Sequence, residues 1–477
     1  METSKRTREA HPGPAFVALA LALALAVAAC APQGSAPGAE GEAAPDPAVR
    51  GAAGAAAAGR PVVSPVRRPE EAEAPLYACS FALPLCAHAP AGAQPGAILA
   101  VLAEAERALR VYDALSLPRP LPDDDRGGGP SYDLYLAADV PPLAPRVGQD
   151  LPALGEPRDA SSAFAVLAAP GPGAEASCAT GSDVAYALGH AVAARLDAGA
   201  SEGELAMAAS YLAALAAPCP AAELAAVDAF QRAPERSITA GELGARDGAL
   251  LFPWYLDEAH GAGQPAGVML GLLAVAGQRT PPGALRYGNE PDIFDALRAS
   301  LRARDRALDA LLLDFAVTRA FVDGSRSRSA GVHLADAARL GGFGRVRLEW
   351  SIPFDTLPRR VAPLRPIEPT GATYVWLDLA AAAVTDAREV TFVADWEVGA
   401  LFRWALVKVG PGGGEVGRVD VAGIYGETRA QRTVVGLEGL AGLLVVGVNA
   451  GSDDRSRPFD PDDAPHAPRG YTVWLSR

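Results

Sequence analysis

In this 477-residue chain, the residues around His190 are the most informative about possible catalytic chemistry. Two histidines four residues apart lie on one face of a helix and can bind one Zn²⁺, and a glutamate after the first histidine activates the metal-bound water. Here Tyr186 stands in place of the first histidine and Ala187 in place of the glutamate. A phenol, with a pKa of about 10, is a poor zinc ligand at neutral pH, and alanine cannot act as a base. The sequence therefore predicts no catalytic residue and no bound zinc at this place.

His190 also has a plainer interpretation. A lone histidine on an alanine-rich helix is more often a packed side chain than a metal ligand. Tyr186 lies one helical turn before His190 and can reach it, so a Tyr186–His190 hydrogen bond in place of a metal is a hypothesis. Asp197 comes seven residues later, about 10 Å along a helix axis, which is too far for direct contact with His190.

Three segments carry a resemblance to a group of bacterial exported gluzincin-like zinc peptidases. The run His190–Asp197 is similar to their His-x₆-Asp continuation. Leu205–Leu212 resembles their next helix, where a Trp-x-x-Glu-x-x-Ala pattern supplies the third zinc ligand, and Ala208 or Ala209 occupies the place of that glutamate. Gly248–Leu256 resembles the following helix, with its Phe-x-x-Tyr-Leu signature.

The resemblance extends over roughly residues 130 to 477, because many such proteins also carry a β-sandwich after the peptidase domain. It implies a peptidase-like fold that has lost its first histidine, its glutamate and its third ligand. Tyr186, His190 and Asp197 would then be a vestigial site, and no catalytic role can be carried over.

The N-terminus indicates export. A short basic start precedes the apolar run Ala15–Ala29, which is too short to span a hydrocarbon core of roughly 30 Å. Cys30 directly after small residues resembles a bacterial lipobox, which implies a cleaved signal (residues 1–29) and a lipid on Cys30. Ala31 is not the aspartate of an inner-membrane retention signal, so the outer membrane is expected. An ordinary signal peptide with an incidental cysteine is the alternative.

The charge of the chain bears on which classes of partner it can bind. The net charge is −14, and lysine and arginine are not clustered, so a nucleic-acid partner is not expected. The predicted partners are the membrane, through the lipid anchor, and an envelope or extracellular protein.

Four cysteines remain once Cys30 is set aside, and an even number in an exported chain favours disulfides. Proximity in sequence favours Cys79–Cys86 and Cys178–Cys219 among three possible pairings. A Cys₄ metal site is the alternative, but the paired Cys-x₂₋₄-Cys spacing that it normally shows is absent.

The composition divides the mature chain into three parts. Residues 30–74 are rich in Ala, Pro and Gly and predict a disordered tether, with order beginning near Tyr77. Residues 75–357 predict an α+β domain dominated by helices, with an antiparallel or mixed sheet. Residues 358–477 predict an all-β sandwich, because short strands alternate with Gly-rich turns.

Periodicity places the elements of these domains. Helices are predicted over 95–112, 182–197, 201–217, 221–231, 247–260, 265–276, 293–304 and 305–322. Ser182 or Asp183 would cap the second of these, and Ser201 with Glu204 fits a capping box on the third. Strands are predicted over 132–138, 161–168, 346–352, 373–379, 389–394, 402–409, 415–421, 432–437, 443–449 and 471–475.

Two acidic loops raise the question of calcium. The loop 122–129 holds Asp123, Asp124 and Asp125 in a row, but it lacks the alternating oxygen spacing of a calcium loop, so a solvated turn is expected. The Asp453–Asp463 loop could bind calcium, although a solvated acidic loop is the default. No cofactor is otherwise predicted.

Three functions remain open. The first is a lipid-anchored envelope protein whose inactive peptidase-like domain binds or scaffolds. The second is an active exported hydrolase with a non-standard site. The third is a structural envelope component without a dedicated ligand.

Overall fold

The structure of the chain, a computed structural model, describes residues 60–61, 66–153, 157–171, 174–240, 248–278, 286–288, 291–322, 345–379, 389–421, 426–452 and 467–477. The chain divides into two compact units, Met1–Ala56 and Ala57–Arg477, and every described residue belongs to the second. Cys30 and the Asp453–Asp463 loop, for which lipid and calcium were considered, lie outside the described residues. No helix in the described ranges is both long enough and apolar enough to cross a bilayer.

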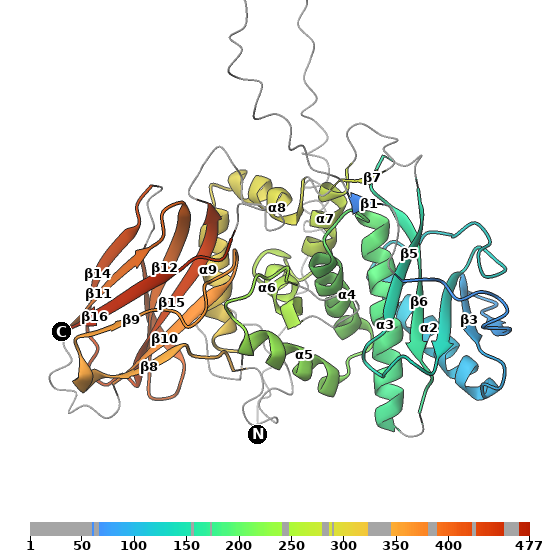
Figure 1. Cartoon of the computed structure of the whole chain (residues 1–477), viewed down its shortest axis with the longest axis horizontal. Helices are drawn as coiled ribbons and strands as arrows, with labels where there is room; N and C mark the ends of the chain where they lie inside the picture. The colour runs from blue at the N-terminus through green and yellow to red at the C-terminus, as the bar shows by residue number, and fades with distance from the viewer. Residues whose placement is uncertain are drawn as a thin grey trace, which may run out of the picture. The chain divides into compact units, whose positions relative to one another are not determined.

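A five-stranded mixed sheet forms the first part of the fold (Figure 1). Its strands lie in the order β2 (Leu76–Cys79), β3 (Leu85–Ala89), β4 (Tyr132–Ala137), β6 (Ser161–Ala168) and β5 (Arg146–Pro152). The central strands β3, β4 and β6 are parallel, and the two edge strands are antiparallel to their neighbours. A small pair, β1 (Arg60–Pro61) with β7 (Arg286–Tyr287), stands apart from this sheet.

Eight helices accompany the sheet in the described part of this region, namely α2 (Pro95–Ala114), α3 (Ala174–Leu196), α4 (Glu202–Ala216), α5 (Pro220–Arg232), α6 (Leu251–His260), α7 (Gly267–Ala276), α8 (Ile293–Arg302) and α9 (Leu308–Arg319). Leu134 of β4 packs with α2 and α3 in the main hydrophobic core. The Tyr112 hydroxyl donates to the Ala185 carbonyl at 2.8 Å, and the Tyr132 hydroxyl donates to the Ala187 carbonyl at 2.9 Å. These bonds fix α3 against both α2 and the sheet.

The start of α3 corrects the sequence prediction. The helix begins at Ala174, so Ser182 and Asp183 lie inside it rather than at its N-cap. The Asp183 carboxylate instead accepts from the Leu143 backbone N–H at 2.9 Å. A serine or aspartate is an N-cap only where the residues before it are not helical. Here the alanine-rich residues before Ser182 are themselves helical.

The start of α4 agrees with its prediction. The Ser201 side chain accepts from the Glu204 backbone N–H, and the Glu204 carboxylate accepts from the Ser201 N–H at 2.8 Å. The capping box is therefore confirmed.

The C-terminal region consists of two packed sheets. One has the order β13 (Glu415–Val421), β12 (Ala400–Val409), β15 (Gly442–Ser452), β10 (Ala372–Asp378) and β8 (Trp350–Pro353). The other has the order β14 (Arg429–Val435), β11 (Glu389–Trp396), β16 (Tyr471–Ser476) and β9 (Arg359–Val361). All strand pairs are antiparallel except β8 with β10, and aromatic residues fill the core between the sheets.

Two boundaries differ from the predicted ones. β8 belongs to the sandwich, so the β region begins before residue 358. At the other end, residues 66–74, which the composition assigns to the tether, are ordered, and Ala74 is buried. The fold class is nevertheless as predicted: a mixed α/β region with eight described helices precedes a region of mainly antiparallel sheets.

Candidate functional site

Tyr186 and His190, which were predicted to belong to a vestigial zinc site, are buried in the described part of the chain. Tyr186 is 1% exposed and His190 is 6% exposed, and their ring centroids are 6.4 Å apart. Helix α4 packs closely at this point, because a Cβ added to Gly189 would lie 3.0 Å from the Leu212 Cβ and 3.2 Å from the Ala209 carbonyl oxygen. Glycine at position 189 therefore permits the close approach of α3 and α4.

The other positions that the resemblance matched to a zinc site offer no ligand. Ala187, Ala208 and Ala209, which were expected in place of a general base and a third ligand, are all buried. In the described part of the chain, the one group of three potential ligands with mutually close ligand atoms does not include His190. A divalent metal next to His190 would therefore depend on ligands outside the described residues or on solvent.

Asp197 has a structural role after α3. Its Oδ1 accepts from the backbone N–H groups of Gly199 at 3.0 Å and Ala200 at 3.1 Å, which shapes the turn into α4. Burial raises the pKa of Asp197 to about 8, and the nearby charges of Asp159 and Asp292 contribute to the rise against the two backbone hydrogen bonds. The carboxyl group is thus largely protonated at neutral pH.

Both predicted disulfides are present. Cys178 of α3 is bonded to Cys219, the residue that precedes α5. Cys79 of β2 is bonded to Cys86, its cross-strand partner on β3. Disulfides persist in oxidising compartments, which indicates that the chain is extracytoplasmic.

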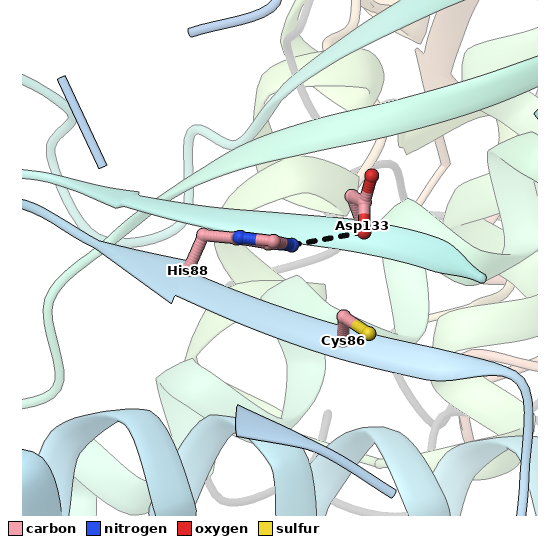
Figure 2. A group of neighbouring side chains, drawn as sticks. All are labelled: Cys86, His88 and Asp133. Carbon is pink, nitrogen blue, oxygen red and sulfur yellow. Dashed lines mark hydrogen bonds and ion pairs between the residues drawn. The ribbon is translucent and has the colours of Figure 1, made fainter. Parts of the chain in front are cut away.

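The close group of potential ligands is Cys86, His88 and Asp133 (Figure 2). Cys86 and His88 come from β3 and Asp133 comes from β4, where His88 Nε2 lies 2.9 Å from Asp133 Oδ1. Cysteine binds metals as a thiolate, and the Cys86 sulfur is already in a disulfide. The group is therefore short of one ligand as long as that bond is intact.

Arg68 occupies the space beside His88 and Asp133. Its guanidinium donates to three buried carboxylates: Nη2 to Asp123 at 2.6 Å, Nη1 to Asp133, and both Nε and Nη2 to Asp150. Nη1 also donates to the Tyr135 hydroxyl at 3.1 Å. All five N–H groups of the guanidinium can therefore be matched with acceptors.

Aromatic rings complete these surroundings. The Arg68 guanidinium carbon lies 4.8 Å from the centroid of the Phe164 ring and 5.7 Å from that of Tyr135. The ring of His88 stacks on Tyr135, with centroids 4.7 Å apart. The cation is thus held by charge, by hydrogen bonds and by aromatic faces at once.

The pKa shifts in the cluster arise because three carboxyl groups surround one guanidinium. Burial raises the pKa of Asp123 to about 7, because the charges of Asp133 and Asp150 add to a desolvation cost that Arg68 only partly offsets. Burial alone would lower the pKa of Arg68, but the hydrogen bond and charge of Asp150 outweigh it and raise that pKa. Burial and the charge of Asp133 raise the pKa of Tyr135 to about 12, so its hydroxyl stays protonated.

This cluster was not predicted from the sequence. The 122–129 loop was expected to be solvated, which holds for the exposed Asp124 and Asp125 but is wrong for the buried Asp123. Arg68 fell within the predicted tether. The one local signal was Asp133, a carboxylate inside an otherwise apolar, alternating strand.

Three further histidines, His260, His333 and His466, are scattered along the chain. His260 is half-buried at the end of α6, where its ring contacts Tyr255, and burial lowers its pKa. His333 and His466 lie outside the described residues.

Comparison with known proteins gives little guidance. No protein-family model matches the sequence, and no curated protein is detectably similar to it. Among solved structures, chitosan-binding module 1 from a chitosanase/glucanase of Paenibacillus sp. IK-5 is similar over 26% of this chain and 80% of the module, with 12% identity and a TM-score of 0.15. A likeness at that TM-score supports no inference about function.

Proposed function

We propose that this chain is an exported, lipid-anchored envelope protein whose peptidase-like region is catalytically inactive and serves in binding or scaffolding. The observation that carries this proposal is the packing of α3 against α4. Tyr186, Ala187, Ala208 and Ala209 stand where a zinc peptidase needs ligands and a base, and none of them is more than 1% exposed. Neither a metal-bound water nor a peptide has access to them without disruption of the core.

The alternative is a working hydrolase with a non-standard site. A zinc peptidase whose metal site is rebuilt around His190 would hold zinc, so the zinc content of the purified chain separates that enzyme from a binding protein. A binding role also requires a partner, which we expect to be an envelope or extracellular protein. Crosslinking in intact cells that yields no reproducible partner would instead favour a structural component without a dedicated ligand.

The anchor depends on Cys30, because a lipobox cysteine carries the lipid. We expect Cys30→Ala to move the chain from the membrane fraction to the soluble fraction, because the variant cannot carry the lipid that anchors it. Immunoblots of fractionated cells measure this, with Cys79→Ala as a control that removes a different cysteine. Retention of the Cys30→Ala chain in the membrane fraction would refute lipid anchoring at this residue.

A further inference from the structure

We propose that Asp123, Asp133 and Asp150 form a guanidinium-binding site, which the chain fills with its own Arg68 so that residues 66–74 are held as a strap across one face of the mixed sheet. The face concerned is the one opposite α2 and α3. On it, Ala74 and Val66 pack with Tyr135, Phe164 and Val166.

The geometry selects guanidinium over other cations. Asp150 receives two parallel N–H groups from Arg68, which is the fork arrangement that only a planar guanidinium provides. Asp123 and Asp133 receive the outer N–H groups on either side. A lysine ammonium is a compact charge with three donors and cannot span three carboxylates while stacking on Phe164.

A second observation points to the site independently of the ion pairs. Asp123 is 1% exposed, and while its Oδ2 accepts from Arg68, its Oδ1 has no hydrogen-bond partner among the residues that the structure describes. Arg68 thus leaves one oxygen of this carboxyl group unused. Most buried side-chain polar atoms in proteins have a hydrogen-bond partner.

The loop before β4 is shaped to close on this site. Gly127 has a positive φ of 80°, and a Cβ added there would lie 2.1 Å from Asp133 Oδ2 and 2.9 Å from the Tyr135 hydroxyl. The carbonyl of the preceding Arg126 accepts from Arg68 at 3.3 Å. A side chain at position 127 would therefore clash with Asp133 and Tyr135, which both contact the Arg68 guanidinium.

Arg68 ties the strap to the three carboxylates. The neighbouring Arg67, Glu70 and Glu73 are exposed and pair with one another at the surface, whereas Val66 and Ala74 pack on the sheet. Release of Arg68 would free the strap and leave an acidic pocket. The ligand class for that pocket is the arginine side chain of a basic peptide.

The test uses Arg68→Ala, with Arg67→Ala as the matched control. Isothermal titration calorimetry with butylguanidine should show one binding site per chain in Arg68→Ala and none in the wild type or in Arg67→Ala. Butylamine, with the same alkyl group, should bind the Arg68→Ala chain at least about tenfold more weakly. Binding of butylguanidine that is equal in the two arginine variants, or equal affinities for the two probes, would overturn the proposal.

The Arg68→Lys variant guards against a failure of Arg68→Ala to fold, because it keeps the charge and most of the stem. A glutamyl endopeptidase can cut the strap after Glu70, Glu71 or Glu73. We expect cleavage of Arg68→Lys at least about tenfold faster than that of the wild type, and cleavage of Arg67→Ala close to the wild-type rate. A wild-type rate for Arg68→Lys would show that any cation suffices and would also overturn the proposal.

Discussion

Asp197→Asn is expected to raise the free energy of unfolding by several kcal/mol, up to roughly 5 kcal/mol, at pH values above 8. Burial raises the pKa of Asp197 to about 8, so the folded chain keeps this proton while the unfolded chain has already lost it above pH 4. The wild type therefore loses stability as the pH rises from about 4 to about 8, whereas asparagine cannot ionise. Its Oδ1 can still accept from Gly199 and Ala200.

Urea unfolding of both chains at pH 5 and pH 9 measures this effect. The variant should be the more stable by about 1.5 kcal/mol at pH 5, and the difference should grow to several kcal/mol at pH 9. Asp139→Asn is the control, because Asp139 is exposed in a surface pair with Arg146, and its removal should change stability by less than about 0.5 kcal/mol. A destabilised Asp197→Asn chain at pH 9 would mean that the ionised carboxylate has a favourable partner, as it would beside a bound cation.

Removal of the Cys178–Cys219 disulfide by Cys178→Ser with Cys219→Ser is expected to cost about 4 kcal/mol. The two cysteines are 41 residues apart, and a loop of that length restricts the unfolded chain by about this amount in the chain-entropy account. Unfolding in urea under oxidising conditions measures the loss.

The Cys79–Cys86 disulfide provides the matched comparison, because its cysteines are only 7 residues apart. Its removal should cost about 2.5 kcal/mol. The double variant without Cys178–Cys219 should therefore be less stable than the double variant without Cys79–Cys86. The reverse order would contradict the loop-length account. Cys178→Ser alone should free one thiol of the four disulfide cysteines, at Cys219, and labelling of Cys79 or Cys86 would show that the pairing exchanges.

Local patterns of the sequence were enough for most of the helices and strands. The capping box at Ser201 and the helix from Pro95 depend on residues within one or two turns, so both were predictable. The two disulfides followed from proximity and an even number of cysteines. β2 and β3 were missed because they are short. β5 was missed because it contains Gly148 and Pro152, which interrupt its alternation.

The Arg68 cluster could not be predicted in the same way. Its three carboxylates lie 55, 65 and 82 residues from Arg68, so no spacing along the chain relates them. Residues 66–74 were assigned to the tether because the Ala- and Pro-rich residues before Val66 dominate the composition of residues 30–74. Composition does not reveal the contacts that Arg68 makes with distant carboxylates. The vestigial site stays a prediction; it could be proposed from the sequence because its positions fall on one helix and the next.

The zinc content of the purified chain without residues 1–29 tests the central claim most directly. The chain is dialysed against zinc and then against buffer, and elemental analysis is compared between the wild type and His190→Ala. The account predicts much less than one zinc per chain, with no difference between the two proteins. One zinc per wild-type chain that is lost in His190→Ala would contradict it and would identify a working metal site on α3.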